Sequence, residues 1–128
     1  MPTVEHSTLS GSELHDPLYI AFSGIIDDIS TADTIYIPMP YAGTVKRITT
    51  VLGGAIATAN ATVTIKNSAA ASMGAIPVAF TGSAAGDVDD LDPSSNNTVT
   101  ANDYITVETD GASTNTVKLY ISVTVEPS

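Results

Sequence analysis

The stretch Val117-Lys118-Leu119-Tyr120-Ile121-Ser122-Val123-Thr124-Val125-Glu126 alternates between two kinds of residue without a break. Its aliphatic residues all fall on one face of an extended chain, and the residues between them fall on the other face. A run of this length at a period of 2 predicts a β-strand with one face in the core, and it leaves little room for a helix.

Similar short segments run through the chain from residue 18 onward, and Gly, Asn, Asp and Pro separate them, as is typical of an all-β protein. We expect further strands at 18–26, 34–39, 44–52, 61–67, 75–82 and 104–109, the fifth of these centred on Val78 and Phe80. The side chains expected to face inward are Leu18, Ile20, Phe22, Ile35, Ile37, Met39, Val63, Ile65, Ile105 and Val107.

Two of these segments carry additional signals. Pro38 and Pro40 close segment 34–39, and since proline cannot donate a ladder hydrogen bond, they indicate an edge strand or a strand end. In segment 44–52, Val45 and Val51 share a face with Arg47, so we expect a β-bulge or a two-sided strand there.

These segments make seven or eight strands, and we interpret residues 68–74 and 84–97 as loops with room for one helical turn. No strand–helix alternation exists, which argues against a parallel α/β sheet. The count and spacing predict an antiparallel two-sheet β-sandwich over residues 18–128. A jelly roll is preferred to an immunoglobulin-like fold, whose Cys and Trp markers are missing. Residues 1–17 show neither the 2-residue period of a strand nor the 3.6-residue period of a helix, and this indicates an extended N-terminal arm.

The composition of the chain argues against several classes of function. The chain has 128 residues, with 4 Lys and Arg against 14 Asp and Glu, for a formal net charge of −10. Phosphate contacts need clustered basic residues, so nucleic acid and anionic membranes are not expected partners. The longest apolar run is also far shorter than a membrane span. There is no cysteine, which excludes thiol catalysis and Cys-based zinc sites.

Candidate chemistry is sparse. The two histidines, His6 and His15, both fall in the expected arm, where no rigid element would hold them for catalysis. We therefore predict that the protein is not an enzyme and uses no cofactor. The acidic residues Asp87, Asp89, Asp90 and Asp92 predict a solvated turn, with a weak Ca²⁺ site as the alternative, because the spacing lacks the glycine and distal Glu of an EF-hand.

The tyrosines allow a second kind of site. Tyr36, Tyr104 and Tyr120 are expected to point outward, and with Tyr19 and Tyr41 they could form a platform on which sugar rings stack. Without tryptophan, however, outward tyrosine on a strand is ordinary β propensity, and it serves a subunit contact equally well.

The segment His6-Ser7-Thr8-Leu9-Ser10-Gly11-Ser12-Glu13-Leu14-His15-Asp16-Pro17 resembles a segment near the N-terminus of tailed-phage virion proteins. There the pattern is His, Ser or Thr, any residue, Leu, Ser or Thr, Gly, two residues, Leu, His, Glu, Pro. This chain departs from it at Asp16, which keeps the charge. Residues 76–88 and 97–103 are similar to jelly-roll decoration and fibre proteins of phages.

The resemblance implies a capsid decoration, or cement, protein that stabilises the capsid. It implies a trimer at three-fold or quasi-three-fold positions on the outer capsid surface of the virion, with the major capsid protein as partner. The arm residues that would bind this partner are His6, Thr8, Leu9, Leu14, His15 and Pro17. A head-fibre or tail-associated jelly-roll module that binds host surface glycan is the alternative, and a bacterial carbohydrate-binding domain is the third interpretation.

Overall fold

The computed structural model describes residues 18–128, which form β-strands joined by turns and loops, with no helix that could cross a membrane in that range. The strands are β1 (Ile20–Ile26), β2 (Asp33–Met39), β3 (Gly43–Leu52), β4 (Ala61–Asn67), β5 (Ser72–Val78), β6 (Val88–Leu91), β7 (Thr98–Val99), β8 (Asp103–Thr109) and β9 (Leu119–Pro127). The predicted arm, residues 1–17, lies outside the described residues.

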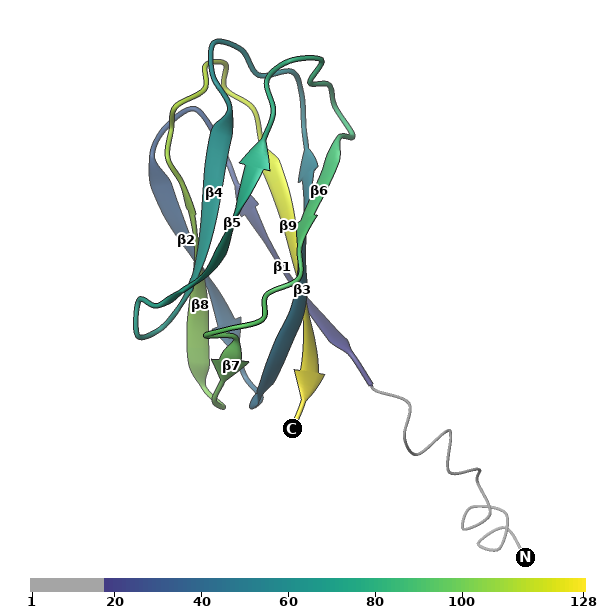
Figure 1. Ribbon diagram of the computed structural model, residues 1–128, viewed down its shortest axis with the longest axis vertical. Helices are drawn as coiled ribbons and strands as arrows, with labels where there is room; N and C mark the ends of the chain where they lie inside the picture. Colours follow the sequence, from purple (N-terminus) through teal and green to yellow (C-terminus); the bar gives the residue numbers. More distant parts are fainter. Residues whose placement is uncertain (1–17) are drawn as a thin grey trace, which may run out of the picture.

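The strands form two antiparallel sheets packed face to face (Figure 1). Sheet A has the order β1-β9-β3-β6, with the short β7 also paired to β3, and sheet B has the order β2-β8-β4-β5. Early strands pair with late ones, as β1 with β9, β2 with β8, β3 with β6 and β4 with β5. This is the pairing of one long hairpin rolled into two sheets, so the predicted jelly roll is confirmed.

The core between the sheets is aliphatic. In β9, Leu119, Ile121, Val123 and Val125 are buried and alternate with half-buried or exposed residues, as the sequence pattern predicts. The predicted inward residues of β2, β4 and β8 are likewise buried or packed against the core. Strand β2 lies at the edge of sheet B, which confirms the prediction from Pro38.

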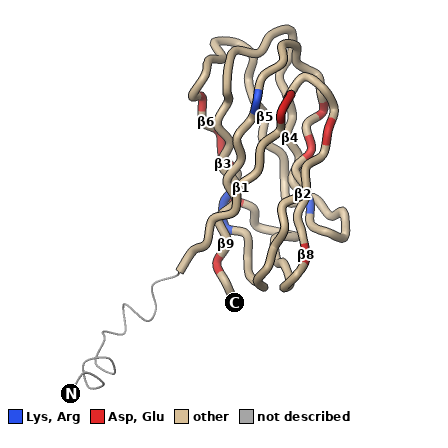
Figure 2. Tube along the Cα trace, turned by 180° about the vertical axis from the view of Figure 1, so that it is seen from behind, with Lys and Arg blue, Asp and Glu red and all other residues tan. Residues whose placement is uncertain are grey.

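Strand β3 contains the predicted bulge. Its register against β9 shifts between Val45 and Arg47, so Lys46 is an extra residue in the strand. Val45 is buried before the bulge, and Ile48, Thr50 and Leu52 are buried after it. The bulge thus leaves Lys46 and Arg47 side by side on the outer surface, while acidic residues are scattered over the described strands and loops (Figure 2).

One predicted inward position is wrong, and the strand predicted over 75–82 ends before Phe80. Leu18 precedes β1 and is 78% exposed, because the edge strand begins only at Ile20. Phe80 is 38% exposed, because β5 ends at Val78 and the chain turns away there. The backbone N–H of Phe80 donates instead to the Asn60 side chain, 3.1 Å away.

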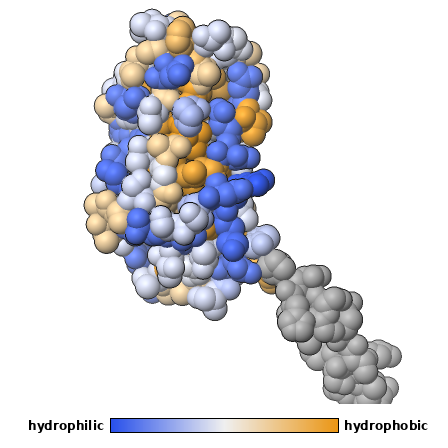
Figure 3. All heavy atoms as spheres, in the orientation of Figure 1, coloured by the Kyte–Doolittle hydropathy of each residue, from blue (hydrophilic) through white to orange (hydrophobic). Residues whose placement is uncertain are grey.

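The predicted loops 68–74 and 84–97 are also partly wrong, since β5 begins at Ser72 and β6 occupies Val88–Leu91. Gly74, at a φ of +138°, has no side chain, and Leu91 fills that space from the opposite sheet. Figure 3 shows apolar side chains gathered between β5 and β6 on this side of the sandwich. Strand β6 is therefore held by one leucine and by pairing with β3, despite its two aspartates.

Candidate interaction surfaces

The residues predicted to bind a partner through the arm, His6, Thr8, Leu9, Leu14, His15 and Pro17, lie outside the described residues. The predicted acidic site and the tyrosines lie within them. The described body therefore offers three surface features: an acidic segment with a basic pocket beside it, the outer face of sheet A, and the outer face of sheet B.

The acidic segment does not form a cluster. Asp89 and Asp90 are neighbours in β6, so their side chains point to opposite faces, and Asp87 accepts a hydrogen bond from the backbone N–H of Ala84 at 2.9 Å. Partial burial raises the pKa of Asp89, and the charges of Asp87 and Asp90 raise it further. Between residues 18 and 128, no three acidic or histidine side chains are grouped as metal ligands.

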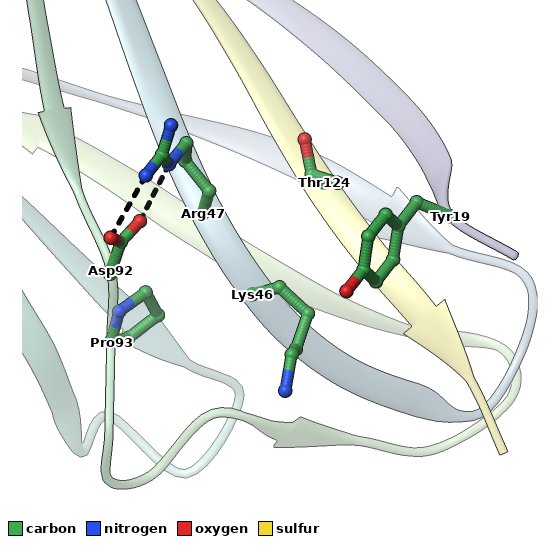
Figure 4. Close-up of a pocket in the computed structure, with 6 residues that line it drawn as sticks. All are labelled: Tyr19, Lys46, Arg47, Asp92, Pro93 and Thr124. Carbon is green, nitrogen blue, oxygen red and sulfur yellow. Dashed lines mark hydrogen bonds and ion pairs between the residues drawn. The ribbon is translucent and has the colours of Figure 1, made fainter. Parts of the chain in front are cut away.

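Asp92 pairs instead with the β3 bulge. Arg47 donates from Nε and Nη2 to the two carboxylate oxygens of Asp92, at 2.6 and 3.0 Å (Figure 4). These hydrogen bonds hold the pKa of Asp92 below its ordinary value and raise that of Arg47. Both groups are exposed, so the pair fixes the chain after β6 more than it stabilises the fold.

The same bulge lines an open pocket on sheet A. Lys46 and Arg47 from β3 and Thr124 from β9 lie beside Tyr19 at the start of the described chain (Figure 4). Two of the four basic residues of the protein therefore lie where the predicted arm joins the body.

The outer face of sheet A carries an apolar row that crosses four strands. Ile25 of β1 pairs with Tyr120 of β9, Tyr120 with Val51 of β3, and Val51 with Val88 of β6. Ile25, Tyr120 and Val88 are 47%, 44% and 61% exposed, so apolar surface faces solvent. The parallel row beside it is Ser23, Ser122, Thr49 and Asp90. Sequence reasoning identified only Tyr120, because the row exists only once the register of four strands is known.

The outer face of sheet B carries a pair of tyrosines. The rings of Tyr36 on β2 and Tyr104 on β8 meet edge to face, with their centroids 5.4 Å apart. They line a hollow of about 250 Å³ together with Lys66 and Glu108, which form an ion pair of 3.0 Å. The prediction that Tyr36, Tyr104 and Tyr120 point outward is confirmed, and the structure separates Tyr120 from the other two by the thickness of the sandwich.

No protein-family model matches this sequence, and no curated protein matches it. Solved structures do share its fold. A chain of the acid-stable capsid structure of Helicobacter pylori bacteriophage KHP30 superposes with a TM-score of 0.57 and 15% identity, over 85% of this chain and 87% of that one. A chain of the capsid asymmetric unit of cyanophage Pam1 gives 0.55 and 13%, over 88% and 86%.

Both neighbours come from phage capsids. At these identities the likeness concerns the fold, and in each case it extends over nearly the whole of both chains. A family 6 carbohydrate-binding module shares the β-sandwich more loosely, with a TM-score of 0.46 and 12% identity over 82% of this chain and 94% of that one.

Proposed function

We propose that this chain is a structural protein of a tailed-phage virion, which binds the outer surface of the capsid and stabilises it. The observation that carries the proposal is the likeness of the whole jelly-roll body to chains of two phage capsid structures. The resemblance of residues 6–17 to the N-terminal segment of phage virion proteins supports it from a part of the sequence outside that body.

The chemistry of the body agrees with a structural role. The sequence has no cysteine, and both histidines precede residue 18, so the jelly roll contains no thiol nucleophile and no histidine to act as a general base at neutral pH. Its surface features are instead a flat apolar row and an aromatic hollow. Features of this kind serve binding.

The arm is the part that we assign to the major capsid protein. Ordering a segment on a partner costs about 1–2 kcal/mol of backbone entropy per residue, and burial of apolar residues on that partner offsets this cost. Leu9 and Leu14 are the apolar anchors, His6 and His15 donate hydrogen bonds to the capsid, and Thr8 and Pro17 complete the motif. Many copies on one shell then act together, so that each contact can be weak.

The apolar row on sheet A is the surface that we assign to self-association, most simply as a trimer at three-fold or quasi-three-fold positions. Copies that each carry a net charge of −10 repel one another. A face whose central rows hold one charged residue, Asp90, lets them approach at the lowest electrostatic cost. Burying the row removes exposed apolar surface from water.

The test is binding to capsids stripped of this protein. The full chain is expected to bind, and a chain that begins at residue 18 is expected to stay folded, because the strands and the aliphatic core described for residues 18–128 remain in it. The shortened chain is expected to fail to bind. Unchanged thermal unfolding of the truncated chain shows that the fold is intact.

A finer comparison keeps the length of the arm. The double substitution Leu9→Ser and Leu14→Ser is expected to abolish binding, and the control Val4→Ser, outside the motif, is expected to leave it intact. Truncated protein that decorates capsids at the occupancy of the full chain would refute the role of the arm.

A further inference from the structure

The hollow around Tyr36 and Tyr104 lies on the sheet opposite to the apolar row, and the capsid proposal makes no use of it. Tyr36 is 66% exposed and Tyr104 38% exposed, so both rings keep accessible surface despite their edge-to-face contact. The two rings therefore offer apolar surface on which a ligand can stack. On β2 each outward residue is followed by one that points into the sandwich, and Ile37, next to Tyr36, is buried. The rings are therefore held by a rigid sheet.

Polar side chains surround the rings. The Lys66 ammonium and the Glu108 carboxylate lie 3.0 Å apart and are each about one-third exposed, which leaves donor and acceptor positions open toward the hollow. Thr34 and Thr106 line the same space. A ring face beside paired donors and acceptors matches a ligand that has C–H bonds on one side and hydroxyl groups around its edge.

The turn after β4, which borders the hollow, is held in place by hydrogen bonds within the protein. Asn67 accepts hydrogen bonds from the backbone N–H groups of Ala69 and Ala71, both at 3.0 Å, and closes the tight turn after β4. Asp103 accepts a hydrogen bond from Ser68 of the same turn at 2.8 Å. A preformed site loses little entropy on binding, so a shallow hollow can still bind a small ligand.

We propose that this hollow is a saccharide site, which binds one pyranose unit of a neutral glycan through stacking on Tyr36 and hydrogen bonds to Lys66 and Glu108. A volume of about 250 Å³ accommodates one sugar ring and is below the range of drug-sized pockets. Glu108 lines the hollow and Asp103 accepts a hydrogen bond from the lining residue Ser68, so two carboxylates lie in or next to the site against the single cation of Lys66, and this balance disfavours acidic sugars. The site is independent of the arm and of the apolar row.

The test is a titration of the full-length, isotope-labelled chain with the methyl glycosides of glucose, galactose, mannose and N-acetylglucosamine, followed by NMR. At least one neutral glycoside is expected to cause saturable shifts confined to the amides of β2, β8 and the turn after β4. N-acetylneuraminic acid, the acidic probe, is expected to cause none. Tyr36→Ala should weaken binding about tenfold, the size expected for one lost aromatic contact.

Two variants control the interpretation. Tyr36→Phe keeps the ring and is expected to keep most of the affinity, and Tyr41→Ala removes a tyrosine that is 59% exposed in the turn before β3 and should change nothing. Absence of saturable shifts with all four neutral glycosides, binding of the acidic sugar instead, or undiminished binding by Tyr36→Ala would each overturn the proposal. Capsid binding by these variants is expected to be normal, so this site and the capsid role can fail separately.

Discussion

At the scale of single residues, two buried threonines differ in whether the side-chain hydroxyl makes a hydrogen bond. The Thr109 hydroxyl, 3% exposed, donates a hydrogen bond to the backbone carbonyl of Ile29 at 3.0 Å. The Thr50 hydroxyl on β3, fully buried, has no hydrogen-bond partner in the described part of the chain. Burying a hydroxyl group that makes no hydrogen bond lowers stability, because the group loses its hydrogen bonds to water and gains none in the protein.

We therefore predict opposite effects of the same substitution. Thr50→Val is expected to raise the free energy of unfolding by about 1 kcal/mol, because it replaces an unpaired hydroxyl with a methyl group of similar size. Thr109→Val is expected to lower it by about 1–2 kcal/mol, because it leaves the Ile29 carbonyl without its partner. Urea unfolding of both variants measures the difference, and a Thr50→Val chain less stable than the parent contradicts the assignment.

At the scale of elements, the β3 bulge makes one residue dispensable for the fold. Val45 pairs with Val125, and the next ladder pair is Arg47 with Thr124, so Lys46 has no ladder partner in β9. Without Lys46, the residues on both sides of the gap keep their present faces. Without Thr49, the strand can stay paired only if one part of it slips by one residue, which either turns Arg47 inward or turns Leu52 outward.

Deletion of Lys46 is expected to change the free energy of unfolding by less than about 1 kcal/mol. Deletion of Thr49 is expected to cost more than about 3 kcal/mol or to prevent folding, because it either places the unpaired charge of Arg47 in the core or turns the buried Leu52 to solvent. Thermal unfolding compares the two chains. Similar losses from both deletions would show that Lys46 supports the fold itself.

The elements also show what sequence can and cannot predict. The inward faces of β4, β8 and β9 follow from the alternation of apolar and polar residues alone, because each strand has one buried face and one solvent-exposed face. The odd spacing around Arg47 predicts a bulge or a two-sided strand, and the register against β9 shows that it is a bulge. Strand β6 was missed because Val88-Asp89-Asp90-Leu91 has poor β propensity, and only its pairing with β3 makes it a strand.

Of the candidate surfaces, the outward tyrosines could be predicted, but their grouping could not. Tyr36 and Tyr104 share a hollow because β2 lies next to β8, and Tyr120 joins the apolar row because β9 lies between β1 and β3. Strand order is a long-range property that local pattern does not encode. The arm motif remains a prediction from sequence.

At the scale of the whole molecule, the proposed self-association has to bring together chains that each carry a net charge of −10. Ile25→Glu places a carboxylate in the apolar row of every copy, at the edge strand β1, without touching the core. We expect this variant to sediment as a monomer and the parent chain to sediment as a trimer, because association of the variant would bury like charges close together. Thr81→Glu, in the exposed turn after β5, adds the same charge elsewhere and is expected to stay trimeric. A monomeric parent contradicts the self-association assigned to this face.

The central claim is that this chain binds the outer surface of a phage capsid. A reconstruction of the virion that carries the chain tests this claim most directly. The account predicts a jelly roll at each three-fold or quasi-three-fold position on the outside of the shell, with residues 1–17 in contact with the major capsid protein. Density for the chain confined to the tail, or its absence from the virion, would contradict the account.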